Sequence, residues 1–270
     1  MDRRKSNHFA TLDSSSRIWA VGAIHAEADA LKYLHEQIRK RFNPEDKIIY
    51  LGNIIGEGKK VIETIDELLA FRLEVISVNG SCDTTEKVIF LRGNQEEMWN
   101  KLLQVQLAIN PLEIIEWLSR QGVNNTLSAY GGTIEQGLNS ARGGARDLAR
   151  WTNKLREAIS NHPGHRDFLS SLKRAALTNQ GSMLFVNCGI DPKRPLDAQK
   201  DSFWWDTRGF KELTHSFCGF KKVIRGYSSN HPGIENNEYT ITIDGGAGFG
   251  GPLIAACLDS EGCVLEQVST

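Results

Sequence analysis

The 270-residue chain lacks several features that would place it in a specialised class of protein. It has no run of 18 apolar residues and no apolar segment near its start, so we expect neither a membrane-spanning helix nor a secretory signal. Its five cysteines are odd in number and form no C-x-x-C pair, which argues against a disulfide framework or a zinc site. These cysteines are Cys82, Cys188, Cys218, Cys257 and Cys263. We therefore expect a folded cytoplasmic protein with no membrane partner.

An excess of charge of one sign is also lacking. The 32 Lys and Arg residues are balanced by 33 Asp and Glu residues, which gives a net charge of −1. Nucleic acid and anionic membrane are not indicated as partners, because no general basic field would attract them. Hydrophobic residues make up 40% of the chain and charged residues 24%, which excludes the disordered, collagen-like and coiled-coil classes.

Short apolar segments that end in glycine alternate with helical patterns in the first hundred residues. Four segments are predicted as strands: residues 17–22, 47–52, 75–78 and 88–91. Between the first two, Leu31, Leu34 and Ile38 recur at helical spacing. This alternation predicts βαβ units in a largely parallel sheet, whose functional groups lie at the carboxyl ends of the strands.

The rest of the chain changes character twice. Residues 97 to about 178 are predicted as a helical insertion that packs on the sheet and is not an independent domain. Short turns and clear alternation then predict antiparallel strands at residues 182–186, 222–224, 239–243, 253–258 and 263–267. We expect residues 1–16 to be a polar leader and residues 17–270 to form one domain.

Five short motifs stand at the ends of predicted strands. They are Gly22-Ala-Ile-His-Ala26, Gly52-Asn-Ile-Ile-Gly-Glu-Gly58, Gly93-Asn-Gln-Glu96, Asn187-Cys-Gly189 and Gly226-Tyr-Ser228. In order and position they resemble the motifs of the calcineurin-like metallophosphatases, above all the bacterial serine/threonine protein phosphatases and diadenosine tetraphosphatases. The resemblance covers about residues 17 to 260. It implies an α/β fold: a metallophosphatase-like β-sandwich of mixed sheets flanked by helices, with a helical insertion.

The resemblance also implies a site, and this chain departs from it at several positions. Such enzymes use two divalent ions held by carboxylates and imidazoles, and an acid that protonates the leaving oxygen. The positions that match the altered ligands and acid of the family pattern are Ala23, Asn53, Gln95, Asn187 and Tyr227. His25 and Asn94 are the core positions that match unaltered. The resemblance therefore predicts a vestigial cleft with no metal and no cofactor.

Charged residues near these motifs allow two interpretations. Glu57 stands where the family pattern has a phosphate-binding arginine and would repel a phosphate. Arg92 and Arg208 match family arginines and could together bind a small anion in the cleft. Alternatively, they form structural salt bridges, for which Glu57 and Glu96 are the candidate partners.

A basic stripe is the last feature of the sequence. Arg142, Arg146, Arg150 and Lys154 recur every four residues, away from the apolar positions of the predicted helix. The stripe is either an ordinary solvated face or a docking surface for an acidic protein partner.

From these departures we predict a catalytically inactive pseudophosphatase, which acts as a binding or regulatory module for a protein partner. Two alternatives remain. One is a weak or altered metal-dependent phosphoesterase, either a protein phosphatase or a nucleotide hydrolase. The other is a phosphate or nucleotide sensor without hydrolysis.

Overall fold

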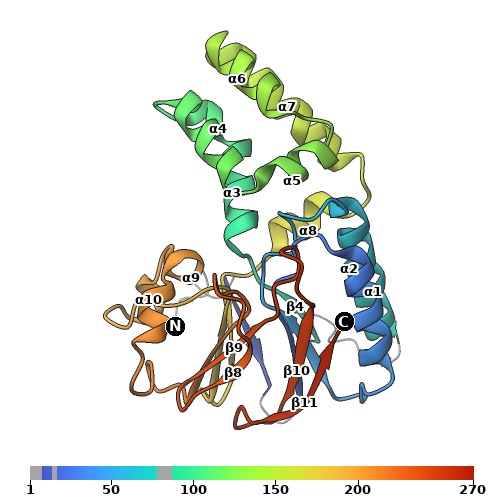
Figure 1. Ribbon diagram of the computed structural model, residues 1–270, viewed down its shortest axis with the longest axis vertical. Coiled ribbons are helices and arrows are strands. Elements are labelled where there is room, and N and C mark those ends of the chain that lie inside the picture. The colour runs from blue at the N-terminus through green and yellow to red at the C-terminus, as the bar shows by residue number, and fades with distance from the viewer. Residues whose placement is uncertain (1–7, 14–16, 78–86) are drawn as a thin grey trace.

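Two β-sheets pack face to face, helices cover their outer faces, and an arm of helices rises above one end (Figure 1). The computed structural model describes residues 8–13, 17–77 and 87–270. Cys82, Val78 and most of the expected leader lie outside the described residues. Within the described ranges, no helix is long and apolar enough to cross a membrane.

The first sheet has the strand order β11-β10-β2-β3-β4. Its strands are β2 (Ile18–Val21), β3 (Lys47–Tyr50), β4 (Val88–Phe90), β10 (Ile254–Leu258) and β11 (Val264–Ser269). β2, β3 and β4 are parallel, and β10 and β11 pair antiparallel. The helices α1 (Ala28–Arg39) and α2 (Val61–Ser77) link the parallel strands and lie against the outer face of this sheet (Figure 1).

The second sheet has the strand order β1-β5-β6-β7-β9-β8. Its strands are β1 (Phe9–Leu12), β5 (Ala175–Thr178), β6 (Met183–Val186), β7 (Lys222–Arg225), β8 (Gly233–Asn236) and β9 (Thr240–Asp244). β6, β7 and β9 run parallel to one another. The 3₁₀ turn η2 (Leu196–Ala198) and the short helices α9 (Ser202–Trp205) and α10 (Thr207–Lys211) lie on its outer side.

The hydrophobic core has three layers because each sheet buries both faces. Leu51, Phe185 and Ile241 belong to the layer between the sheets. A larger layer joins the first sheet to α1, α2 and the arm, and a smaller one joins the second sheet to α9 and α10. Tight packing on every face fixes the strand ends in space, and the functional loops leave from those ends.

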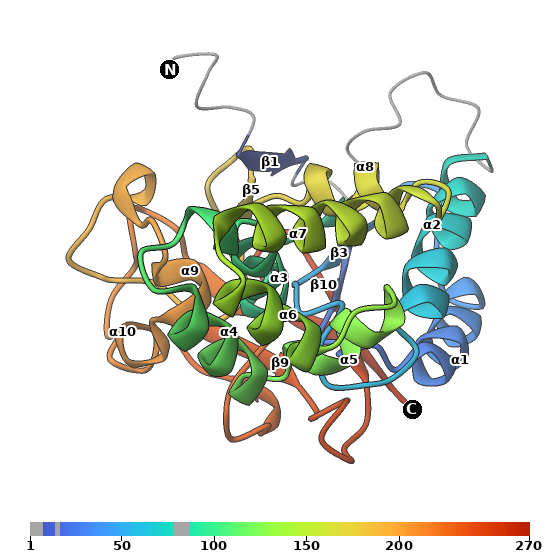
Figure 2. The same ribbon diagram turned by 90° about the horizontal axis from the view of Figure 1, so that it is seen from above.

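The arm consists of helices that lie between β4 and β5 in the sequence. They are α3 (Asn94–Leu103), η1 (Val105–Leu107), α4 (Pro111–Arg120), α5 (Val123–Ala129), α6 (Ile134–Arg142) and α7 (Ala145–Ser160). α8 (His165–Ser171) then returns the chain to the second sheet. Seen from above, the arm crosses over the end of the sandwich (Figure 2).

The predicted fold class is confirmed, but four details are wrong. Residues 75–77 continue α2, because Leu68, Phe71 and Val75 lie on one buried helical face. The expected leader contains β1, a short edge strand too weakly patterned to stand out. The insertion ends before residue 175, because residues 175–178 form β5 of the second sheet; its helices share a hydrophobic core with the first sheet and rise above it (Figure 1). In the second half, β6, β7 and β9 are parallel because crossovers, not hairpins, connect them.

Candidate functional site

The loops that follow β2, β3, β4, β6 and β7 meet at the end of the sandwich beneath the arm. Ala23 N–H donates to the carbonyl of Gly226 at 2.9 Å, which ties the first motif to the fifth. His25 N–H donates to the carbonyl of Asn53 at 2.8 Å, which ties the first motif to the second. The sequence motifs are therefore brought together, as the resemblance implies.

Glu96 holds the second and third motifs in place. Its carboxylate is buried and accepts hydrogen bonds from four backbone N–H groups, those of Asn53 (3.0 Å), Ile54 (2.7 Å), Ile55 (3.0 Å) and Gly93 (2.6 Å). Gly93 must be glycine, because a Cβ there would overlap Oδ1 of Asn53. Sequence reasoning treated Glu96 only as a partner for arginine and missed this role.

Asn187 connects the two sheets through its side-chain amide. It is fully buried, its Nδ2 donates to the carbonyl of Leu51 at 2.8 Å, and its Oδ1 accepts from Asn94 N–H at 3.2 Å. The Oδ1 of Asn53 likewise accepts from Gln95 N–H at 3.3 Å. The two amides at predicted ligand positions thus serve the protein's own hydrogen bonds.

His25 is an uncharged, buried residue at this site. Its side chain is 1% exposed and its Nδ1 has no hydrogen-bond partner in the described chain. Burial, with a smaller contribution from His231, lowers the pKa of His25 to about 3. The rings of Tyr227 and Phe249 lie 5.7 Å and 5.1 Å from the imidazole.

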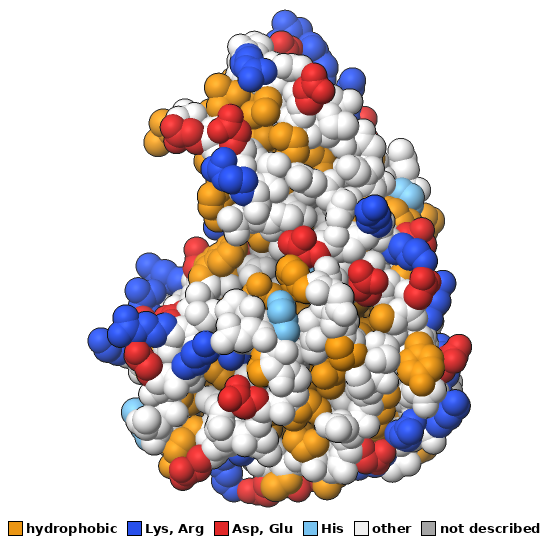
Figure 3. All heavy atoms as spheres, in the orientation of Figure 1, with side chains coloured by type: hydrophobic (Ala, Val, Ile, Leu, Met, Phe, Trp, Pro, Cys, Tyr) orange, Lys and Arg blue, Asp and Glu red, His pale blue; other side chains and the backbone are white. Residues whose placement is uncertain are grey.

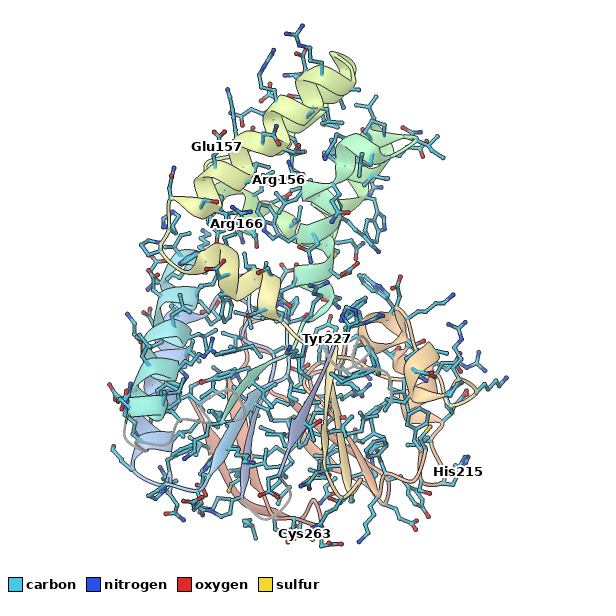
Figure 4. The ribbon with its side chains drawn as sticks, turned by 180° about the vertical axis from the view of Figure 1, so that it is seen from behind. Arg156, Glu157, Arg166, His215, Tyr227 and Cys263 are labelled. Atoms are coloured by element: carbon cyan, nitrogen blue, oxygen red, sulfur yellow. The ribbon has the colours of Figure 1, made fainter. Side chains whose placement is uncertain are left out.

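Tyr227 lies where the arm meets the sandwich, as Figure 4 shows. Burial raises the pKa of its phenol to about 12, so it keeps its proton at neutral pH. Burial also raises the pKa of the Cys188 thiol to about 12, which leaves that residue unreactive.

A second histidine, which sequence reasoning missed, pairs with a carboxylate at the same site. His231 Nδ1 lies 2.9 Å from Oδ2 of Asp244, and Asp244 is the last residue of β9. Asp244 is itself fixed by N–H donors from Ser228 (2.7 Å) and Gly246 (3.0 Å). The carboxylate places the proton on Nδ1 and leaves Nε2 of the partly exposed imidazole as an acceptor. An Asp at a strand end was the sequence signal that could have indicated this pair.

The arm approaches the site at Glu57. This carboxylate lies so close to Gly122 that a Cβ there would overlap its Oε1, and the backbone carbonyl of Glu57 accepts from Asn125 Nδ2. Gln95 Nε2 also reaches the arm, where it donates to the carbonyl of Gln121 at 3.0 Å. Burial raises the pKa of Glu57, which favours its neutral form relative to an exposed carboxyl group.

The structure does not unite Arg92 and Arg208 in one anion clamp. Arg92 pairs with Glu97 at 3.4 Å, and Arg208 pairs with Glu212 at 2.7 Å on the exposed side of α10. Both are therefore ion-paired, but the suggested partners Glu57 and Glu96 are wrong, because those carboxylates face the arm and the backbone of the strand-end loops.

The basic stripe is divided between two helices. Arg142 ends α6, the residues Gly143 and Gly144 break the helix, and α7 begins at Ala145. Arg146, Arg150 and Lys154 are exposed on α7, where Arg150 pairs with Asp147 at 3.0 Å. The prediction that all four residues lie on one continuous helix is thus wrong, because two glycines interrupt the helix. Their role as a docking surface stays a prediction.

The site residues do not fit the two divalent ions that the fold family implies. Ala23 offers no ligand atom, the amides of Asn53 and Asn187 are engaged, and Tyr227 is protonated. Across residues 8–13, 17–77 and 87–270, no three His, Cys, Asp or Glu side chains are grouped so that they could hold a metal ion. Neutral amides and one imidazole are a poor set for a pair of hard cations.

Comparison with known proteins identifies the family. The symmetrical bis(5'-nucleosyl)-tetraphosphatase of Xylella fastidiosa (strain 9a5c) is 30% identical over 284 residues, which cover 93% of this chain and 91% of that protein. This chain belongs to the calcineurin-like metallophosphoesterases. The enzyme of the same name from Xanthomonas euvesicatoria pv. vesicatoria is 24% identical and covers 93% of this chain and 84% of its own length. The chain matches no family model.

Solved structures agree on the fold of this metallophosphoesterase. A candidate diadenosine tetraphosphatase superposes with a TM-score of 0.55 at 16% identity and covers 98% of both chains. A protein serine/threonine phosphatase from Saccharomyces cerevisiae gives a TM-score of 0.51 at 14% identity, covering 99% of this chain and 85% of the other.

The relatives correct one prediction from the sequence. We expected a catalytically inactive binding module, but proteins that match this chain over most of its length are named as tetraphosphatases. The prediction of inactivity rested on altered residues at single ligand positions. The relatives, in contrast, match the chain over most of its length. The finding favours the alternative interpretation, a phosphoesterase.

Proposed function

We propose that this chain is a weak phosphoesterase with altered metal use, which acts on a nucleotide phosphoester. The observation that carries the proposal is the His231–Asp244 pair, set at 2.9 Å among the strand-end loops of a metallophosphoesterase fold. The nucleotide class comes from the relatives, which are named for bis(5'-nucleosyl) tetraphosphates.

The His231–Asp244 pair has the geometry of a general base with an orienting carboxylate. With Nδ1 bound to Asp244, Nε2 of His231 can take a proton from a water molecule as the water oxygen attacks phosphorus. The bond between phosphorus and the leaving oxygen then breaks, and the imidazolium returns the proton to that oxygen. The carboxylate of Asp244, 2.9 Å from Nδ1, faces the imidazolium and stabilises it.

Two exposed aromatic side chains where α4 of the arm approaches α9 favour a nucleotide over a phosphorylated protein side chain. Trp117 of α4 and Trp205 of α9 are both partly exposed, and their ring centroids lie 6.4 Å apart. The surface is hollowed where the arm meets the sandwich (Figure 3). Bases stack on such aromatic faces, each stack contributing about 1–3 kcal/mol.

Hydrolysis of diadenosine tetraphosphate tests this proposal. We expect slow turnover by the unaltered protein, reduced about a hundredfold in His231→Asn, which loses the base but suits the left-handed backbone at that position (φ 45°). After dialysis against Mn²⁺, fewer than two metal ions should remain bound per chain.

The matched control is His215→Asn, which removes an exposed histidine far from Tyr227 (Figure 4) and should leave turnover unchanged. A wild-type rate no faster than that of buffer, or equal rates in the wild type and His231→Asn, would contradict the proposal.

A further inference from the structure

A cavity of about 610 Å³ lies where α3, α7 and α8 meet. Arg92, Arg156 and Arg166 line it together with Glu157, and Figure 4 shows the last three on the arm and α8. None of the strand-end residues described above, other than Arg92, lines it. Its volume falls within the range of small-molecule sites, about 300–1,000 Å³.

The arginines of this cavity have few acidic partners. Arg156 donates to the neutral oxygens of Asn153 (2.7 Å), Thr152 (3.3 Å) and Leu103. Within the part of the chain that the structure describes, Arg166 makes no hydrogen bond or ion pair. Guanidinium groups that lack carboxylates present spare N–H donors, which suit the oxygens of a phosphate.

A second cavity, of about 720 Å³, continues the basic surface. The two cavities share Arg92 and Ser170, and the second is also lined by Arg72, Lys173 and Arg174. The Nε–H groups of Arg92 and Arg174 are both buried without an acceptor among the described residues. Six basic side chains thus line the two cavities, against the carboxylates of Glu97, Glu157 and Asp201.

The first cavity also has an apolar wall. Trp99, Leu103, Ile159 and Leu169 line it beside the arginines. Inorganic phosphate would leave this wall uncovered, whereas a base and sugar could pack against it while the phosphates reach the arginines. A chain of several phosphates could pass Arg92 into the second cavity.

We propose that the two cavities form one binding site for a nucleoside polyphosphate, separate from the strand-end loops. The site joins α7 of the arm to α3 and α8, so an occupant would hold the arm against the sandwich. The proposal does not depend on hydrolysis at His231, because it rests on the charge and shape of a different surface.

Calorimetric titration with ATP in the presence of EDTA tests the site without any metal. We expect Arg166→Gln to weaken ATP binding about tenfold, because it removes an exposed cation that lines the cavity and makes no hydrogen bond or ion pair among the described residues. The control Arg208→Gln removes the same charge from α10 and should change the dissociation constant less than about twofold. Adenosine and tripolyphosphate should each bind at least about tenfold more weakly than ATP.

Three results would overturn the site. If Arg166→Gln and Arg208→Gln weaken ATP binding equally, the attraction is a general effect of charge. If tripolyphosphate binds as tightly as ATP, the apolar wall does not contribute to binding. ATP binding that survives Arg166→Gln but is lost in His231→Asn would place the nucleotide at the strand-end loops instead. Loss of hydrolysis alone would affect only the proposed function.

Discussion

Three residues of the strand-end site have an unusual backbone conformation. His25 (φ 49°), Asn53 (φ 51°) and His231 (φ 45°) all lie in the left-handed region, which residues other than glycine rarely adopt. Each such residue costs on the order of 1 kcal/mol, and such strain concentrates at functional sites. The surrounding hydrogen bonds and packing must therefore hold the two imidazoles where they are.

The buried His25 makes stability depend on pH. Its pKa is about 3 in the folded chain and about 6.5 in an unfolded chain, so the unfolded state binds more protons between these values. Stability should therefore fall as the pH falls through this window, by at most about 1.4 kcal/mol per pH unit. We expect the wild type to lose about 2 kcal/mol more than His25→Asn between pH 7 and pH 5.

Urea unfolding at the two pH values measures this difference. Asparagine is a suitable replacement because it tolerates the left-handed backbone at position 25. Other buried histidines such as His35 remain in both proteins, so their contributions cancel. Identical losses of stability in the two proteins would show that His25 binds its proton as readily in the folded chain as in the unfolded chain, so that burial does not lower its pKa.

At the level of elements, the sequence predicted best where an apolar run meets a glycine. β2 and β3 were found because every residue of each strand is buried and a turn follows directly. β1 and β8 were missed, since both are short, partly exposed edge strands. The partner of β1 is also distant in sequence, whereas β8 pairs with the next strand, β9. The strand-end motifs were located correctly, but His231 was not, because its pairing with Asp244 depends on β7 and β9 lying side by side.

The start of α3 gives a prediction at this scale. Replacing Glu96 with Gln removes the charge from a group that accepts four backbone N–H donors and turns an amide N–H₂ toward some of them. Because buried hydrogen bonds to a charged group are strong, we expect Glu96→Gln to lower the free energy of unfolding by about 2–4 kcal/mol. Thermal or urea unfolding measures the loss.

The neighbouring Glu97→Gln provides the control for this substitution. Glu97 begins the same helix but makes only a 3.4 Å ion pair with Arg92, so its loss should cost less than about 1 kcal/mol. Similar losses for the two variants would mean that the loop after β3 does not depend on the Glu96 carboxylate.

In the whole molecule, the arm is held to the sandwich by a chain of polar groups as well as by the core. Tyr130 follows α5, and its hydroxyl lies 2.9 Å from Nδ1 of His165 in α8. Nε2 of His165 lies 3.0 Å from Oδ1 of Asp66 in α2. These hydrogen bonds join three elements that are far apart in sequence, which is why no local sequence pattern could indicate them.

Removing the hydroxyl of Tyr130 should loosen the arm without unfolding the sandwich. In Tyr130→Phe the ring can still stack on Trp99, but His165 is left with a buried nitrogen that lacks its partner, at a cost of about 1–3 kcal/mol. We expect amide hydrogen exchange in α5–α7 to become about tenfold faster while α1 keeps its protection. Tyr33→Phe, which alters an exposed tyrosine on α1, should leave the exchange rates of α1 and of α5–α7 unchanged.

Because Glu57 contacts Gly122 at the arm, a loosened arm should also weaken substrate binding at the strand-end loops. Equal acceleration of exchange in α1 and α5–α7 would instead show that the arm and the sandwich open as one unit.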